Sequence, residues 1–233
     1  MKMPFGPSAR SSALKPHECA VTWQACSLLL DYPDERMLAG RSMLRRAVAP
    51  LPAFIGEPLT AFLDHLDVMP QARLAADYVA TFDHRKRCCL YLTYYSYGDT
   101  RKRGMALLRI KQTYRAAGLV LDDGELPDHL AVVLEFGATA DPETALRLLT
   151  EYRAGLELLR LALTEADSPW AHVLHAISAS LPPLDGDGRT AVQRLAAAGP
   201  PEEEVGLAPF GSSDGPVFLP EPRLRVDAQG ART

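Results

Sequence analysis

The stretch ELPDHLAVVLEF, residues 125–136, decides the fold. Its second part, Leu130–Phe136, is almost wholly apolar, with Glu135 as its only charge. A helix that is apolar on all sides is buried, so we expect this one at the centre of the domain. Asp128 and His129 stand directly before it, and an acidic residue at a helix start can cap free backbone N–H groups.

Start and stop signals for helices occur on both sides of this segment. Proline, acidic residues and glycine at the ends of apolar periodic stretches predict further helices. These cover residues 21–30, 34–49, 57–68, 70–82, 88–97, 99–117, 141–163, a stretch that begins at 168, and 190–198. The chain is therefore predicted to be all-α, a single-domain helical bundle.

The stretch Cys88–Tyr97 is dense in Tyr, Leu and Thr, which gives it a strand-like composition. We nevertheless predict a helix, because no other segment offers a plausible strand partner and a lone strand is not stable.

The helix that follows this stretch has apolar residues on two sides. Asp99 is predicted to cap its start and Gly118 to close its end. Met105 and Leu108 lie on one side, and Ile110 lies on the other. We expect this helix to be packed from both directions.

Composition divides the chain into three parts. Residues 1–16 are rich in Ser, Pro and Gly, and are predicted to form a flexible N-terminal leader. Residues 17–198 carry the helical patterns and form the predicted domain. Residues 199–233 contain six Pro and five Gly, so we expect a disordered tail.

The charge distribution is uneven. The whole chain of 233 residues has a formal net charge of -4 and a pI near 5.9. These values argue against a protein that binds nucleic acid over its whole surface. Residues 84–103, however, contain six Lys or Arg and one acid, a basic island on an acidic body. No apolar run reaches the roughly 18 residues of a membrane span. We therefore expect a cytoplasmic protein with no direct membrane insertion.

No constellation of residues predicts catalysis or a metal site. His172 and His175 are three residues apart on a predicted helix, but no HExxH pattern accompanies them. Cys88 follows Arg87 without a visible histidine and acid to activate it. The segment GDTRKRG, residues 98–104, lacks the phosphate-loop pattern and a preceding strand. We expect a binding protein rather than an enzyme.

Five motifs, taken in order, resemble the NarJ family, the delta subunit of respiratory nitrate reductases, within the TorD/DmsD group of redox-enzyme maturation chaperones. Together they extend the resemblance from about Cys19 to Leu163. The motifs are SLLLDYPDE, YVATFDHRKRCCLYLT, GDTRKRGMALL, YRAAG and ELPDHLAVVLEF.

The resemblance implies a TorD-like helical fold and a chaperone function. Members of this family bind the apo form of the catalytic (alpha) subunit of nitrate reductase at its N-terminal segment, in the cytoplasm. They hold it while the molybdenum bis(guanine dinucleotide) cofactor and an iron–sulfur cluster are inserted, and they delay membrane anchoring. The resemblance thus implies no permanently bound cofactor, transient contact with the molybdenum cofactor, and contact with its delivery proteins.

Eight residues are predicted to bind the partner. The aromatic members, predicted to build an apolar groove, are Tyr78, Phe82 and Tyr91. The members predicted to form its rim or hinge are Glu125, Asp128 and His129. The basic members, predicted to contact acidic parts of the client or of the cofactor machinery, are Arg101 and Arg103. The charge of His129 can change near neutral pH, which predicts pH-dependent binding.

Two other classes of function compete with this interpretation. A helical nucleic-acid-binding or regulatory protein would use the basic 84–103 segment and would bind with a steep salt dependence. The acidic remainder of the chain and the lack of a helix-turn-helix pattern argue against it. An enzyme acting on a nucleotide or a pterin would need a catalytic constellation that the sequence does not contain.

Overall fold

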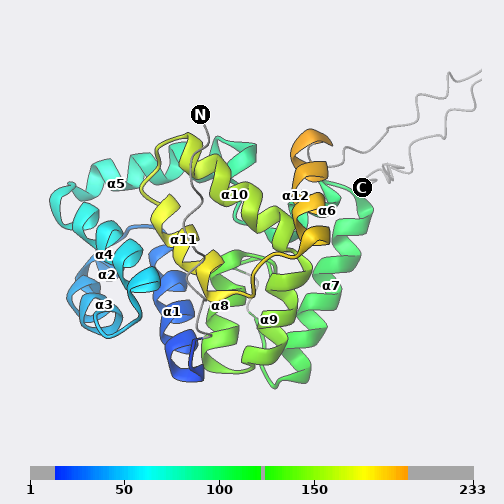
Figure 1. The fold of residues 1–233 in the computed structure, drawn as a ribbon, viewed down its shortest axis with the longest axis horizontal. Helices are drawn as coiled ribbons and strands as arrows, with labels where there is room; N and C mark the ends of the chain where they lie inside the picture. The colour runs from blue at the N-terminus through cyan, green and yellow to red at the C-terminus, as the bar shows by residue number, and fades with distance from the viewer. Residues whose placement is uncertain (1–13, 122–123, 199–233) are drawn as a thin grey trace, which may run out of the picture. The chain divides into compact units, whose positions relative to one another are not determined.

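The predicted helix over Leu130–Phe136 forms as α8, Leu130–Thr139, which lies between helices α1, Pro16–Leu29, and α9, Pro142–Glu151 (Figure 1). The computed structural model describes residues 14–121 and 124–198. Helices α1 and α9 pack against α8, and five of its ten residues are buried. The predicted tail, and the predicted leader up to residue 13, lie outside the described residues.

The all-α fold is confirmed. The remaining helices are α2 (Glu35–Ala39), α3 (Arg41–Val48), α4 (Ala53–Val68), α5 (Gln71–Tyr78), α6 (Leu92–Tyr97), α7 (Arg101–Ala116), α10 (Arg153–Glu165), α11 (Ala171–Ser180) and α12 (Gly186–Ala198). A π-helical turn, η1 (Val79–Asp83), continues α5, and a short 3-10 helix, η2 (Lys86–Cys88), follows it. Helix α11 packs against α1, α4 and α10, and α12 covers α10.

Two predicted helices are each divided in the structure. The one predicted over 34–49 is interrupted at Gly40, because the Arg41 guanidinium bonds the carbonyls of Leu38 and Leu66, 2.8 and 2.6 Å away. The one predicted over 141–163 is interrupted at Tyr152.

The interruption at Tyr152 separates two buried neighbours that contact different helices. The Tyr152 hydroxyl accepts from Arg109 of α7, whereas the Arg153 guanidinium donates to Ser178 of α11. The leucine spacing that predicts one long helix carries no sign of these two contacts.

The prediction of a helix over Cys88–Tyr97 is wrong for the first part of that stretch. Only Leu92–Tyr97 is α-helical, and Tyr91 forms an isolated antiparallel bridge with His129. The Leu92 N–H donates to the Asp128 carbonyl at 3.0 Å, and the Leu130 N–H donates to the Leu90 carbonyl at 2.8 Å. The extended residues are stable because their partner is the segment that leads into α8.

Helix α7 differs from its prediction at its start and on one face. Its N-cap is Thr100, and the Asp99 carboxylate pairs with Arg103 instead of capping. Gly118, with a φ of 81°, closes the end as predicted. Met105 and Leu108 are 68% and 48% exposed, so packing from both directions is wrong for the described residues.

No helix among residues 14–121 and 124–198 is both long and apolar enough to cross a membrane.

Replacing Gly137 with alanine is expected to destabilise the domain. A Cβ atom at Gly137 would lie 2.6 Å from both Ala145 Cβ and Trp23 Cε3, and overpacking of this kind costs about 1–3 kcal/mol. Gly104 is the matched control, because a Cβ atom there meets nothing within 4 Å. Gly104→Ala should raise the free energy of unfolding by about 0.5–1 kcal/mol, since glycine disfavours a helix interior.

Urea unfolding of both variants checks this pair of predictions. A Gly137→Ala protein as stable as the wild type would show that α8 does not pack this closely on Trp23.

Candidate functional site

Five of the eight predicted partner-binding residues meet at one corner of the domain, where the Leu90–Thr93 segment crosses the entry to α8. We call this the Asp128 corner, formed by Tyr91, Arg103, Glu125, Asp128 and His129. The crossing is fixed by the bridge between Tyr91 and His129.

Asp128 caps a helix, but not the helix it precedes. Its side chain is fully buried, and Oδ2 accepts from the Thr93 N–H at 3.1 Å and from the Thr93 hydroxyl at 2.5 Å. Thr93 lies in the first turn of α6, so the carboxylate satisfies a free N–H group at that helix start. The predicted cap of α8 is wrong, since His129 is its N-cap and no side chain caps it.

Arg103 offsets the negative charge of the buried carboxylate. Its Nη2 lies 3.9 Å from Asp128 Oδ2, its Nε donates to the Thr93 hydroxyl at 3.3 Å, and its Nη1 donates to Asp99 at 3.1 Å. The guanidinium also lies over the Tyr91 ring, with 5.5 Å to the centroid. Through these polar and cation–π contacts, Arg103 links α7 to the buried residues of the corner.

Tyr91 and Glu125 form the more accessible side of the corner, next to the buried His129. The Tyr91 hydroxyl donates to Glu125 Oε1 at 3.1 Å, and burial together with that carboxylate raises the pKa of Tyr91 to about 12. The rings of Tyr91 and His129 meet edge to face with centroids 5.3 Å apart. Tyr91 and Glu125 are half-buried, and their neighbour Leu126 is exposed.

Two buried polar atoms of the corner have no hydrogen-bond partner among the described residues, Asp128 Oδ1 and His129 Nδ1. Burial lowers the pKa of the His129 imidazole below its usual 6.5, while Glu125 and Asp128 oppose the shift. An unpaired buried polar atom is costly, and such atoms are rare in folded proteins. Both atoms are shielded from solvent, so the corner holds one acceptor and one imidazole nitrogen that are unsatisfied in the closed structure.

The other three predicted residues lie elsewhere. Tyr78 and Phe82 are buried against Trp170, with ring centroids 5.7 and 5.4 Å from it, and the Tyr78 hydroxyl donates to the Leu30 carbonyl. Both side chains are therefore part of the hydrophobic core, and little of either ring is exposed. Arg101 is exposed on α7.

The sequence did not predict Thr93 as part of this site, although its N–H and hydroxyl donate to the Asp128 carboxylate. A threonine within a Tyr-rich stretch gives no sign of a partner 35 residues away.

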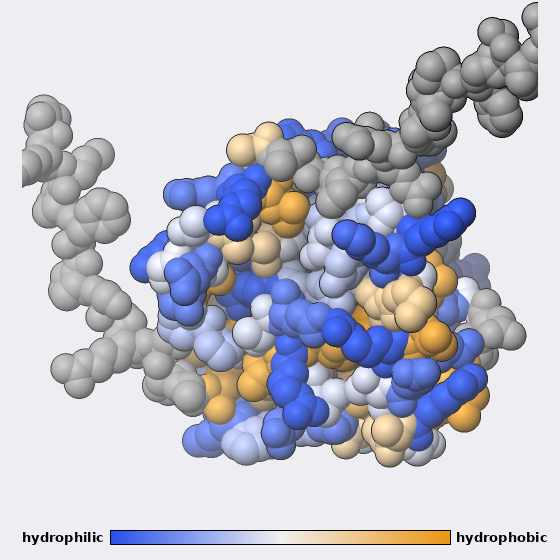
Figure 2. Space-filling model, turned by 90° about the vertical axis from the view of Figure 1, so that its right-hand side faces the viewer, coloured by the Kyte–Doolittle hydropathy of each residue, from blue (hydrophilic) through white to orange (hydrophobic). Residues whose placement is uncertain are grey.

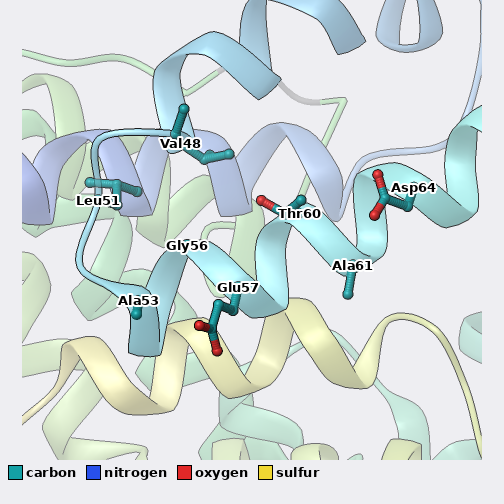
Figure 3. A pocket seen from close by; sticks show the side chains of 9 residues that line it. Val48, Leu51, Ala53, Gly56, Glu57, Thr60, Ala61 and Asp64 are labelled. Carbon is teal, nitrogen blue, oxygen red and sulfur yellow. The ribbon is translucent and has the colours of Figure 1, made fainter.

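Two open hollows lie outside the corner. One, of about 470 Å³, is formed by α3, α4 and the loop between them, and Glu57 and Asp64 are its charged lining residues (Figure 3). The other, of about 420 Å³, lies between η2 and the end of α10. Neither contains a predicted partner-binding residue. Among the described residues, no group of three or more His, Cys, Asp or Glu is placed to hold a metal ion.

Replacing Asp128 with alanine is expected to lower the free energy of unfolding by roughly 1.5–3 kcal/mol, the range for hydrogen bonds to a charged group. The Thr93 N–H would lose its partner in a buried site. Asp141→Ala is the matched control, since Asp141 caps α9 through the Thr144 N–H near the surface. Urea unfolding should show a clearly smaller loss for Asp141→Ala. Equal losses would contradict the importance of the buried cap.

The His129 imidazole should make the domain less stable in mild acid. Its folded pKa lies below the unfolded value near 6.5, so the unfolded chain binds the proton more tightly. The neutral His129 imidazole adds its full contribution to the free energy of unfolding above about pH 6.5. This contribution is lost as the pH falls through the folded pKa of His129. His65 and His175 also have pKa values lowered by burial. The contribution of His129 is therefore the difference between wild type and His129→Gln, measured by unfolding from pH 7.5 to 5.5; equal slopes would contradict it.

Known proteins resemble this chain in sequence and fold. Residues 49–176 match the family model described as nitrate reductase delta subunit. The chain is 44% identical over 158 residues to the nitrate reductase-like protein NarX of Mycobacterium tuberculosis, which covers 67% of this chain and 24% of NarX. It therefore spans about a quarter of that relative.

Two further matches cover most of the compared protein. Identity is 35% over 162 residues to NarJ of Bacillus subtilis, named as a probable nitrate reductase molybdenum cofactor assembly chaperone, and covers 69% of this chain and 88% of NarJ. The crystal structure of a proposed redox enzyme maturation protein from Archaeoglobus fulgidus matches the fold with a TM-score of 0.52 and 23% identity, over 74% of this chain and 97% of that one. The chain therefore belongs to the nitrate reductase delta subunit family, the NarJ family that its motifs resemble.

Proposed function

We propose that this protein is a dedicated chaperone for a respiratory nitrate reductase. It binds the apo catalytic (alpha) subunit at its N-terminal segment in the cytoplasm, and assists insertion of the molybdenum cofactor and assembly of the complex before membrane anchoring. Family membership supports the chaperone assignment, and the name of the Bacillus subtilis relative supports the cofactor-assembly role.

The observation that carries the proposal is the pair of unpaired buried atoms in the Asp128 corner, Asp128 Oδ1 and His129 Nδ1. A peptide lying along Tyr91 and the exposed Leu126 would reach the half-buried Glu125 directly, and would bring donors to Asp128 Oδ1 once the corner opens on binding. Apolar contacts would supply affinity, and Glu125 would supply selectivity by charge.

The molybdenum cofactor is cargo in this proposal. The protein holds the client in a form that receives the cofactor, and contacts between chaperone and cofactor or its delivery proteins are transient. Turnover by the chaperone is not part of the proposal.

The alternative, nucleic-acid binding through the 84–103 island, has less support from the geometry. Arg103 turns inward to Asp99 and Asp128, so it is not presented to a phosphate backbone. The exposed cations that remain are divided between η2 and α7.

Calorimetric titration with a peptide that copies the N-terminus of the nitrate reductase catalytic subunit of the same organism tests the proposal. We expect selective binding over a scrambled peptide, with a negative heat-capacity change from apolar burial. His129→Gln and Tyr91→Ala should each weaken binding by about tenfold or more, the loss typical of a central contact residue.

His65→Gln is the matched control. His65 is a half-buried histidine whose Nε2 also has no partner, but it stacks on Phe62 away from the corner. It should leave the peptide affinity unchanged. Folded His129→Gln and Tyr91→Ala proteins with wild-type affinity would refute the corner as the client site.

A further inference from the structure

The basic island at residues 84–103 contains three cations that the Asp128 corner does not use. Arg85, Lys86 and Arg87 lie at the start of η2, and all three are exposed. None of them forms an ion pair with another residue in the described part of the chain. Arg103, by contrast, turns inward to the corner. The fold therefore leaves three adjacent positive charges without a carboxylate partner among the residues that the structure describes.

These three cations line the open hollow of about 420 Å³ between η2 and the end of α10. Helix α10 and its last turn contribute two small apolar residues and one acid, Ala162, Ala166 and Glu165. The buried Cys88 completes the lining. The hollow is therefore cationic along η2 and mainly apolar along α10.

The backbone that carries the cations is held from inside the domain. The Tyr95 side chain is buried, and its hydroxyl lies 3.0 Å from the Arg87 carbonyl and 2.9 Å from the Cys89 carbonyl. Helix α10 packs closely on the same tyrosine, because a Cβ atom at Gly155 would lie 2.7 Å from Tyr95 Cβ. Both walls of the hollow thus rest on one buried side chain. Walls that are fixed before binding reduce the cost of ordering the site around a ligand.

The charges of Arg85 and Arg87 act on one side chain of the hollow, the Cys88 thiol. Burial raises the pKa of Cys88, and the two guanidinium groups oppose this shift. A positive charge lowers the pKa of a thiol only when it lies nearby. Both guanidinium groups therefore lie close to the residue that completes the lining.

We propose that this hollow binds a phosphate-bearing small molecule of nucleotide size. Its phosphate groups lie against Arg85, Lys86 and Arg87, and its flat apolar part lies against the alanines of α10. Arginine presents N–H donors in a planar fork that matches phosphate oxygens, and lysine adds a point charge. A hollow of about 420 Å³ has the volume of a small-molecule pocket, which is typically about 300–1,000 Å³. The site needs no client, so this proposal is independent of the proposed function.

A small ligand fits the hollow better than a macromolecule does. A nucleic acid is bound by a basic stripe or face, whereas here three cations lie on a chain with a formal net charge of -4. A protein partner covers about 800 Å² of surface, which extends well beyond one hollow. The exposed Glu165 would also repel an acidic segment that continued along α10.

Calorimetric titration of the full-length protein with inorganic phosphate, pyrophosphate and ATP, without divalent cations, tests the proposal. Affinity should rise in that order, because pyrophosphate reaches more cations and ATP adds a ring that packs on α10. The Arg85→Ala/Arg87→Ala variant should bind ATP about tenfold or more weakly, since it loses two charge-assisted contacts. Glu165→Gln should bind ATP severalfold more tightly, because a like charge is removed from the lining. Rising salt concentration should weaken binding of ATP to the wild type.

Arg46→Ala/Arg115→Ala is the matched control, because it removes the same two charges at exposed positions on α3 and α7, outside the hollow. Figure 2 views the side of the domain on which α7 lies, where hydrophilic side chains surround the apolar patches. The control should keep the wild-type affinity for ATP, and both double variants should keep the wild-type melting temperature.

Four results would each overturn the proposal. One is wild-type affinity of a folded Arg85→Ala/Arg87→Ala protein for ATP, and another is an equal loss in the control, which would show a general effect of surface charge. The third is equal affinity for inorganic phosphate and ATP, which would show a site for free anions only. The last is tighter binding of a short DNA duplex or a polyglutamate peptide than of ATP, lost in the same variant. Each of them leaves the Asp128 corner standing as the proposed client site.

Discussion

Two helix starts far apart in the sequence depend on each other for their hydrogen bonds. The N–H groups of Leu92 and Thr93, in the first turn of α6, both bond Asp128, one through its carbonyl and one through its carboxylate. In return, the Leu130 N–H at the start of α8 bonds the Leu90 carbonyl. Helix α6 has only six residues, too few to be stable alone, so its position depends on this exchange. The exchange fixes the Tyr91–His129 contact and brings Arg103 to the buried carboxylate.

The same exchange leaves the corner with unsatisfied polar groups. It buries a carboxylate and an imidazole but satisfies each only in part, since Asp128 Oδ1 and His129 Nδ1 remain without partners. The cost of such atoms falls when a partner donates to one of them or accepts from the other. A site of this kind gains binding free energy from groups that the folded domain already holds in place. On the opposite face of α7, Met105 and Leu108 are exposed.

Much of this architecture could be predicted from the sequence, because local signals determine it. The apolar run 130–136 marks helix α8, Asp141 caps α9 at the predicted helix start, and Gly118 closes α7. The failures have a common cause in contacts between distant segments. Asp128 caps a helix 35 residues earlier, and the extended residues before Leu92 pair with the entry to α8. No periodicity within either segment records these contacts.

The candidate site was predictable in part for the same reason. Glu125, Asp128 and His129 stood out because a helix start concentrates polar residues, and Tyr91 and Arg103 because aromatic and basic residues cluster near them in sequence. Tyr78 and Phe82 were placed in a groove, yet they pack on Trp170 in the core. One sequence does not distinguish a buried aromatic from a groove aromatic, because both follow the same helical spacing.

Hydrogen exchange of the whole protein, with and without the N-terminal peptide of the catalytic subunit, tests the central claim most directly. If the Asp128 corner receives the client, the amides of residues 91–93 and 125–130 should exchange more slowly in the complex, because binding there restricts the opening of both helix starts. Slower exchange confined to another region, such as the hollow between α3 and α4, with these amides unchanged, would contradict the account.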